Sequence, residues 1–210
     1  PTRRSSDLLM GKGEKEKKDL YIEGVQNNGI INHYEYIINS EGTIEIRHVL
    51  KPEGKMPLWF PRIGLTLTVS DALDQVKWYG RGPQENYPDR KTGYPMGIYA
   101  STVQAMYEPY LMPQDYGLRT DVRWLQLTTD KGIGLQFKMN EWFNFNIYPY
   151  STDNLTKAMY TYQLQKQKGM TLNLDYATTG VGCTARGVFG AYKAMPQEYR
   201  RTISIRPMMK

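Results

Sequence analysis

Apolar and polar residues alternate with a period of two along much of this chain, which is the pattern of a β-strand with one buried face. The alternation is clearest in residues 42–50, 63–70, 74–80, 124–139, 143–150, 171–177 and 202–207. Each of these segments is predicted to lie in a β-sheet with its apolar side chains toward a core.

Residues 124–139 contain two alternating runs separated by Asp130, Lys131 and Gly132. A short break with a glycine between two such runs is typical of a β-hairpin. This segment is therefore the clearest predicted hairpin in the chain.

A helical pattern is confined to residues 151–159, where Ser151, Thr152 and Asp153 are suitable N-caps. It predicts one or two turns at most. About 8 to 10 short strands without alternating helices predict an all-β fold, an antiparallel sandwich rather than an α/β fold. No repeat and no linker interrupt the chain after Tyr21.

Composition supports a globular domain without a nucleic-acid partner. The chain has 210 residues and is 40% hydrophobic, enough for a packed core. Its net charge is +6, but the first twenty residues supply six basic and four acidic side chains, or +2. The remaining 21 basic and 17 acidic residues are interspersed, whereas a nucleic-acid binder gathers positive charge on a stripe or an arm.

The single cysteine, Cys183, excludes an intrachain disulfide, and no Cys/His set has zinc spacing. No apolar run approaches the ~18 residues of a membrane span. We therefore expect neither a metal site nor a membrane segment in this chain.

The N-terminal residues differ in character from the rest. Residues 1–8 resemble a translated sequencing adapter, and residues 10–20 form a lysine-rich run interrupted by glycine. Residues 1–20 are interpreted as a non-native or disordered leader, and residues 21–210 as the folded domain.

Histidines and phosphate loops do not suggest catalysis. Only His33 and His48 are present, both in predicted strands, where an ordinary structural histidine is the favoured interpretation. The segment "GRGPQEN" lacks the Gly-Lys-Ser/Thr ending of a phosphate-binding loop and no helix pattern follows it.

Paired carboxylates remain a route to sugar hydrolysis, because one acid can protonate the leaving group while another attacks or activates water. The candidates are Glu85, Asp89, Asp115, Asp121 and Asp175. A retaining mechanism needs two of them ~5 Å apart, which the sequence alone does not establish. Most loop acids are solvated or structurally paired, so none is assigned a catalytic role.

The densest polar chemistry lies in residues 80–95, "GRGPQENYPDRKTGYP". Its turn formers are Gly80, Gly82, Pro83 and Pro88, its planar polar groups are Arg81, Gln84, Glu85, Asn86, Asp89 and Arg90, and its aromatic neighbours are Trp78, Tyr79 and Tyr87. Such groups suit sugar hydroxyls and the C–H face of a pyranose. They also suit a structural loop that bonds its own backbone, and composition does not decide between the two.

Several segments together resemble one family. They are "PRIGLTLTV", "VKWYGRGPQENYPDRKTG", "YEPYLMPQDYGLRTDVRWLQLT", "FNFNIYPYSTDNL", "TLNLDYATTGVG" and "YRRTISIRP". In this order, over residues 61–207, they resemble the C-terminal domain of the large bacterial β-galactosidases of glycoside hydrolase family 2. The run "GRGPQENYPDR" is the most specific.

The resemblance implies a β-supersandwich of the galactose-mutarotase type, the last domain of a much longer chain. The parent enzyme would hydrolyse terminal β-galactosides such as lactose with retention, as a homo-oligomer. Its catalytic glutamates and its Mg and Na ligands would lie on preceding domains. We therefore expect this chain to be an N-terminally truncated fragment that is inactive alone, and its compartment stays open between bacterial cytoplasm and periplasm.

Residue by residue, the resemblance carries over an accessory site without catalytic residues. Its loop is formed by Gly82, Pro83, Gln84, Glu85, Asn86, Tyr87, Pro88, Asp89 and Arg90, which match the family's mobile active-site loop. This loop is expected to hold alternative open and closed sets of hydrogen bonds.

A second family feature is altered. After "GVGG" the family usually has two aspartates, a serine and a tryptophan that forms a platform for the aglycone, whereas this chain has "GVGCTARGVFGAY". Phe189 is the nearest aromatic substitute, and Arg186 is an alternative aglycone contact. The parent is therefore expected to have a weaker or different aglycone preference.

Two alternatives remain open. A stand-alone carbohydrate-binding module would use the aromatic residues between Trp78 and Tyr87, and a structural or assembly domain would only dock on its enzyme through an apolar face. A mutarotase would need a catalytic histidine, and His33 and His48 lie outside the segment of resemblance.

Overall fold

A computed structural model describes residues 28–183 and 187–209. The predicted leader and Arg186 lie outside the described residues.

The described residues form nine strands and three short helices. The strands are β1 (Asn28–Ile38), β2 (Ile44–Gly54), β3 (Arg62–Val69), β4 (Gln75–Arg81), β5 (Met96–Thr102), β6 (Arg119–Thr128), β7 (Gly134–Tyr148), β8 (Met170–Thr178) and β9 (Tyr199–Met208). The helices are α1 (Thr152–Lys157) and the 3-10 turns η2 (Thr161–Gln163) and η3 (Gly190–Tyr192). This composition confirms the all-β prediction.

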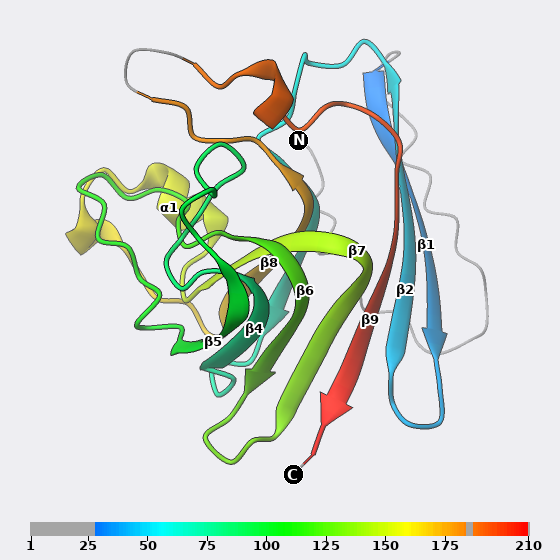
Figure 1. Cartoon of the computed structure of the whole chain (residues 1–210), viewed down its shortest axis with the longest axis vertical. Helices are drawn as coiled ribbons and strands as arrows, with labels where there is room; N and C mark the ends of the chain where they lie inside the picture. The colour runs from blue at the N-terminus through cyan, green and yellow to red at the C-terminus, as the bar shows by residue number, and fades with distance from the viewer. Residues whose placement is uncertain (1–27, 184–186, 210) are drawn as a thin grey trace.

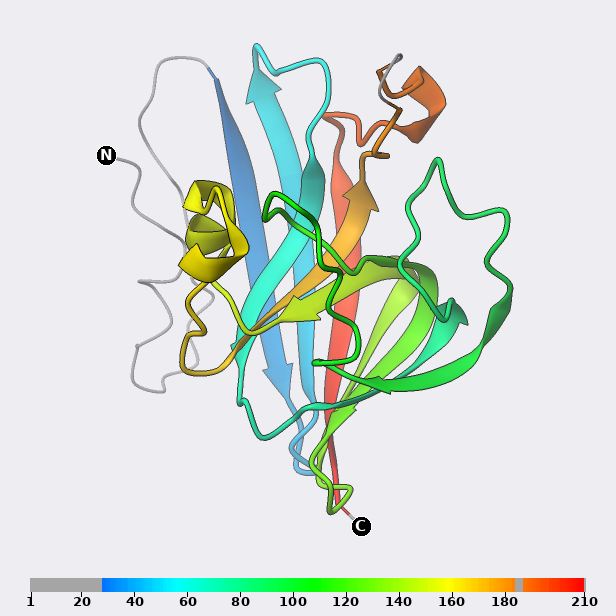
Figure 2. The ribbon, with the colours of Figure 1, turned by 90° about the vertical axis from the view of Figure 1, so that its left-hand side faces the viewer.

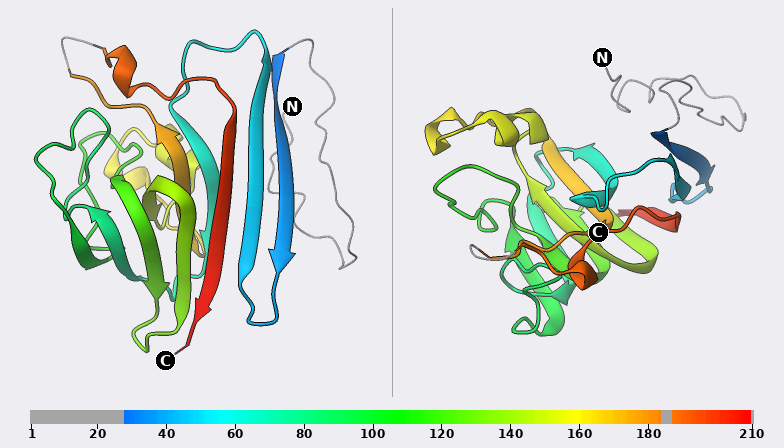
Figure 3. Two further views of the ribbon diagram at one scale, coloured as in Figure 1. Left: turned by 45° about the vertical axis from the view of Figure 1, so that its right-hand side comes forward. Right: turned by 90° about the horizontal axis from the view of Figure 1, so that it is seen from above.

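All strand pairs are antiparallel. The main path is β1-β2-β9-β7-β6-β4-β5, while β8 pairs with β7 and β3 outside it. Figure 3 shows β6, β7, β9, β2 and β1 side by side, and Figure 1 shows β7 curving between this broad layer and β8. The predicted sandwich is thus one continuous sheet folded over at β7.

Strand β7 makes this fold possible. Its first part, residues 134–139, pairs with β9, whereas its second part, residues 144–148, pairs with β8. Two separate alternating segments were expected here, ending at residue 139 and starting at residue 143. They form one strand because neither glycine nor proline stands at residues 140–142 and the backbone stays extended through the bend.

The core lies between the two layers, on the alternating positions that the sequence indicates. Val76 and Trp78 of β4 are buried, as are Ile46 and Leu50 of β2. The Trp78 indole meets Phe145 of β7 edge-on, with 5.9 Å between ring centroids. Burial of these side chains is the main stabilising contribution, at about 1.5–3 kcal/mol for each large apolar group.

Strand β8 departs from simple alternation because both of its faces are buried. Its polar residues are covered by residues 103–118 and by the α1 region, which lie outside β7 and β8 in Figure 2. Asn173, for example, donates to the Asn146 Oδ1 at 2.9 Å and to the Tyr148 hydroxyl at 3.0 Å. Hydrogen bonding of this kind makes the burial of polar groups tolerable.

Local predictions at the turns are confirmed. The hairpin between β6 and β7 is closed by the Thr129 N–H, which donates to the Ile133 carbonyl at 2.8 Å, and Gly132 has φ +78. Helix α1 begins after Ser151, whose hydroxyl accepts from the Asn154 N–H at 3.0 Å.

Candidate functional site

The 82–90 loop, defined as residues 82–90, follows β4 and lies on a buried framework. Its first bond, Gly82–Pro83, is cis. The Arg119 Nε donates to the Pro83 carbonyl at 3.0 Å, and the Trp78 indole donates to the Arg81 carbonyl at 3.0 Å. Both donors come from strands, so the loop starts from a position set by the sheet.

Glu85 is buried at the centre of the loop, with 5% of its surface exposed. Its carboxylate accepts from the Gly117 N–H at 2.9 Å, from Arg90 at 2.9 Å and from the hydroxyls of Tyr87 and Tyr110. Burial alone would raise the pKa of Glu85, but these hydrogen bonds outweigh it and the pKa lies below its usual value.

Asn86 is fully buried and uses both ends of its amide. Its Oδ1 accepts from the Thr120 N–H at 3.1 Å and from the Thr120 hydroxyl at 2.5 Å, while its Nδ2 donates to the Gln84 carbonyl at 3.0 Å. The buried half of the loop therefore bonds its own surroundings. Pro83, Gln84 and Arg90 remain exposed.

The geometry of the loop bears on the alternative of a stand-alone carbohydrate-binding module. Trp78 and Tyr87 are buried, so the idea that they present flat faces to a sugar is wrong. The reason is packing: Arg119 lies over Trp78 and Arg90 over Tyr87, at 5.5 and 5.3 Å from the ring centroids. Mobility of the loop and contact with substrate remain predictions.

Asp89 joins the loop to the second feature singled out in the sequence. Its carboxylate accepts from the backbone N–H groups of Val181 and Gly182, at 3.1 and 2.7 Å. A Cβ atom on Gly180 would lie 2.3 Å from the Asp89 carboxylate carbon, so only glycine fits there. The structure thus brings the "GVG" segment to the 82–90 loop, a contact across more than ninety residues that the sequence did not reveal.

Phe189, the predicted aglycone platform, precedes η3 and is 64% exposed. Its ring is available for contact, and its role stays a prediction.

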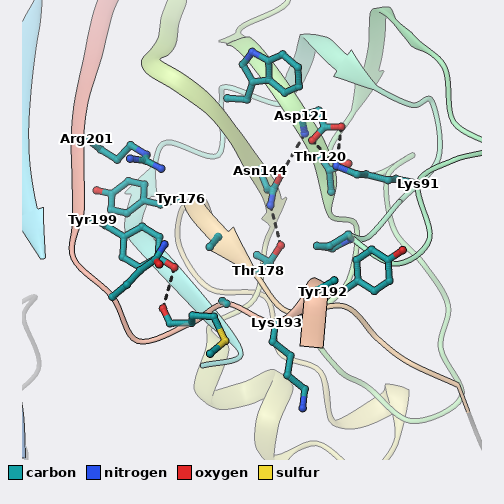
Figure 4. A pocket seen from close by; sticks show the side chains of 17 residues that line it. Lys91, Thr120, Asp121, Asn144, Tyr176, Thr178, Tyr192, Lys193, Tyr199 and Arg201 are labelled. Atoms are coloured by element: carbon teal, nitrogen blue, oxygen red, sulfur yellow. Dashed lines mark hydrogen bonds and ion pairs between the residues drawn. The ribbon is translucent and has the colours of Figure 1, made fainter. Parts of the chain in front are cut away.

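An open cleft of about 360 Å³ lies beside the loop. We call it the 88–201 cleft. Its lining includes Pro88, Lys91 and residues 191–195, and Figure 4 shows Lys91 and Tyr192 on one side and Tyr176, Tyr199 and Arg201 on the other. Its remaining lining residues are Thr120, Asp121, Trp142, Asn144, Tyr176, Ala177, Thr178, Gln197, Tyr199 and Arg201.

The cleft floor is a chain of hydrogen bonds. The Asp121 N–H donates to the Asn144 Oδ1 at 3.2 Å, and the Asn144 Nδ2 donates to the Thr178 hydroxyl at 2.8 Å (Figure 4). Asp121 has φ +56, in the left-handed region that few non-glycine residues occupy. Neither Asn144 nor Thr178 is a candidate from the sequence, because only the pairing of β7 with β8 brings them together.

Ion pairs fix Asp121 in this position. Its carboxylate lies 2.8 Å from the Lys91 Nζ and 2.6 Å from the Arg81 Nε. Burial raises the pKa of Asp121, but Lys91 and Arg81 outweigh it and leave the pKa below its usual value. Asp121 therefore holds the chain after the 82–90 loop rather than acting as a free acid.

The other candidate acids are also engaged. Arg62 binds Asp175 through two nitrogens, at 2.5 and 3.1 Å, and binds Asp115 at 3.2 Å. Burial raises the pKa of Asp175 to about 6, and Arg62 opposes the rise. A guanidinium thus bridges these two carboxylates, so they are not arranged around an open substrate position.

His48 is a buried structural histidine, as the sequence suggested. Its ring bonds the Tyr176 hydroxyl at 2.7 Å and the Asn32 Oδ1 at 3.0 Å, and it stacks on Tyr34 at 4.1 Å. Burial lowers the pKa of His48 to about 4. Its contact with Tyr176 joins β2 to β8.

Within residues 28–183 and 187–209, no three His, Cys, Asp or Glu side chains gather closely enough to hold a metal ion. Over the same residues, no helix is long and apolar enough to cross a membrane.

Comparisons with known proteins extend the resemblance toward the N-terminus. The model of the family described as "Beta galactosidase small chain" matches residues 7–205. The resemblance seen in the sequence covers residues 61–207.

Individual relatives support the same assignment. Over 164 residues the chain is 36% identical to a β-galactosidase of Priestia megaterium, covering 78% of this chain and 16% of that protein. It is 39% identical over 122 residues to one from Vibrio cholerae, covering 58% and 11%. It is 33% identical over 159 residues to one from Pseudoalteromonas haloplanktis, covering 74% and 14%.

The chain thus spans less than a fifth of the length of these curated relatives. With a family match over residues 7–205, it belongs to the β-galactosidase small-chain family.

Proposed function

We propose that this chain is the C-terminal β-sandwich domain of a larger β-galactosidase, a glycoside hydrolase that cleaves terminal β-D-galactosides with retention. The observation that carries the proposal is the family match over residues 7–205, set against coverage of only 11–16% of the relatives' length. Most of such an enzyme, including its catalytic glutamates and its Mg and Na ligands, would lie on other domains.

The candidate acids support an accessory rather than a catalytic role. Glu85, Asp121 and Asp175 are each held by cationic side chains. Asp89 is bound by backbone N–H groups. A retaining glycosidase needs a carboxylate nucleophile and a second acid on either side of the scissile bond, and these contacts are those of structural acids.

The 82–90 loop is well built to present groups to a substrate held by other domains. Its exposed Gln84 and Arg90 flank the buried anchors Glu85 and Asn86. Rigid anchors beneath an exposed tip allow a loop to position ligand contacts accurately. Its partners would be the galactoside and the remaining domains, in a homo-oligomeric parent.

A specific observation favours a second candidate, an assembly role. Among the strands of residues 28–183 and 187–209, β1 is at the sheet edge, and its Tyr36 and Ile38 are exposed. Unpaired edges and exposed apolar side chains are typical of a surface that docks on another element. The two roles are compatible in one domain.

A chimera tests the accessory role. This chain would replace the matching segment of the Priestia megaterium enzyme, to which it is 36% identical. Gln84→Ala is expected to lower kcat/KM for lactose about tenfold or more, because it removes a polar contact to the sugar, whereas Arg90→Ala would also remove the ion pair with Glu85. Tyr162→Ala, at an exposed tyrosine in η2, is the matched control. Loop variants as active as the control would refute the role.

A further inference from the structure

We propose that the 88–201 cleft is a binding subsite for a neutral saccharide unit, and that it holds the reducing-side sugars of an extended galactoside. Saccharide binding is argued from the cleft itself. Its part in hydrolysis rests on the proposed function.

The cleft has the dimensions and setting of a small-ligand site. Its volume of about 360 Å³ lies within the range of about 300–1,000 Å³ typical of such sites. It is walled by segments from distant parts of the chain, and Figure 4 shows Asn144 and Thr178 between Lys91 and Tyr192 on one side and Tyr176 and Arg201 on the other. Asp89 holds the segment 180–182, and the Lys91–Asp121 ion pair holds the residues after the 82–90 loop, so this part of the wall is fixed.

The charges indicate a neutral ligand. Lys91 is paired with Asp121 at 2.8 Å, and Arg201 with Glu141 at 2.9 Å. The Lys193 ammonium lies 5.6 Å from the ring centroid of Trp59. Two of the three lining cations are thus paired with carboxylates, which lowers the positive charge open to phosphate or carboxylate and favours a ligand that presents hydroxyl groups.

Hydrogen-bonding capacity remains on the cleft floor. The Thr178 hydroxyl accepts from Asn144, which leaves its own proton free to donate. Asn144 uses one of its two Nδ2 protons in that bond, so a second donor is left. Adjacent donors and acceptors of this kind match the vicinal hydroxyls of a sugar.

Aromatic side chains supply the apolar part of the site. Trp142 of β7 is 55% exposed and Tyr192 of η3 is 39% exposed. Each combines a flat apolar surface with a polar tip, which suits the C–H face and the hydroxyl rim of a pyranose. Arg123 packs on Trp142 at 3.6 Å from its ring centroid and holds the indole in place.

The position of the cleft indicates which part of a galactoside it would bind. Pro88 belongs both to the 82–90 loop and to the cleft wall. If the loop contacts the galactosyl unit, the next units toward the reducing end extend into the cleft. A disaccharide would reach only its entrance, whereas a trisaccharide would reach Asn144 and Thr178.

Binding to the intact 210-residue chain is the first test, by calorimetry with β-linked galactotriose and with galactose. We expect galactotriose to bind more tightly than galactose. Trp142→Ala and Thr178→Val should each raise the Kd for galactotriose about tenfold, because they remove the ring and the hydroxyl. Tyr162→Ala, outside the cleft, should leave the Kd unchanged.

Three outcomes would overturn the proposal: no binding of galactotriose, equal binding by the cleft variants and the control, or displacement of galactotriose by inorganic phosphate. Thermal melting checks that each variant folds. Both variants are expected to fold, because Trp142 is exposed and Val is close in shape to Thr. If one of them melts at a lower temperature than the wild type, Tyr192→Ala takes its place.

The chimeric enzyme separates this proposal from the proposed function. There, Thr178→Val should raise KM for galactotriose, whereas the control Tyr162→Ala should leave kcat and KM for galactotriose unchanged. If the isolated chain binds galactotriose but cannot complete an active enzyme, the cleft stands and the proposed function fails. If the chimera is active but the isolated chain does not bind galactotriose, the cleft proposal is refuted and the proposed function stands.

Discussion

Asp89 shows how one side chain joins two parts of the candidate site. It is the link between the 82–90 loop and the segment 180–182, and its bonds to two backbone N–H groups cannot be made by an aliphatic residue. The motif that contains it was identified from the sequence, but its partner was not. Contacts across more than ninety residues leave no local pattern to read.

Asp89→Ala is expected to destabilise the fold by about 1–3 kcal/mol, because it leaves two backbone N–H groups without their acceptor. Denaturant unfolding measures the change. Asp130→Ala, at an exposed position of the β6–β7 turn, is the matched control and should have little effect. Equal stability of the two variants would show that the Asp89 link is not important in solution.

Variants of Phe189 test whether the altered segment after Gly182 contacts the aglycone. In the chimera, Phe189→Trp is expected to lower KM for lactose, because a larger ring offers more surface to the glucose unit. Phe189→Ala should raise it. Lactose kinetics of the three proteins measure the series, and identical KM values would exclude Phe189 as a platform.

At the scale of elements, the alternation of apolar and polar residues predicts strands correctly where one face of the strand is buried. It indicated β2, β3, β4 and the β6–β7 hairpin, since Ile46, Trp78 and Leu125 all point inward. It missed edge strand β5, whose sequence "MGIYAST" has little alternation and is ordered by pairing with β4. It also missed the burial of Asn173 and Asp175, which depends on covering segments rather than on local sequence.

The β1–β2 hairpin is linked to β8 through His48 and Tyr176. Titration of His48 therefore makes the stability of the fold depend on pH. The pKa of His48 is lowered to about 4 in the folded protein, while an unfolded histidine titrates near 6.5. Between these values the unfolded chain binds more protons, so stability falls as pH decreases from about 6.5 to about 4. The loss is up to about 3 kcal/mol.

His48→Gln should reduce this slope, measured by chemical unfolding at several pH values. Asp175 acts in the opposite sense, because its pKa is raised to about 6 and it favours the folded state as pH falls toward 4. The difference between wild type and variant isolates His48. Parallel stability curves for the two proteins would contradict a buried neutral histidine at this position.

At the scale of the whole molecule, the described residues form one sheet that folds over at β7. Family membership follows from residues 7–205. The fold class was predictable from alternation, whereas the 88–201 cleft was not, because its walls meet only after β7 has folded the sheet over. What the cleft and loop contact in the parent depends on domains outside this chain.

The most direct test of the central claim is hydrolysis of a chromogenic β-galactoside by the purified chain, alone and after mixing with the Priestia megaterium enzyme truncated before the matching segment. Our account predicts no hydrolysis by either piece alone and recovery on mixing, because the chain completes a site built elsewhere. Hydrolysis by the chain alone would contradict it, since a catalytic carboxylate pair would then lie among the acids assigned here to structural contacts.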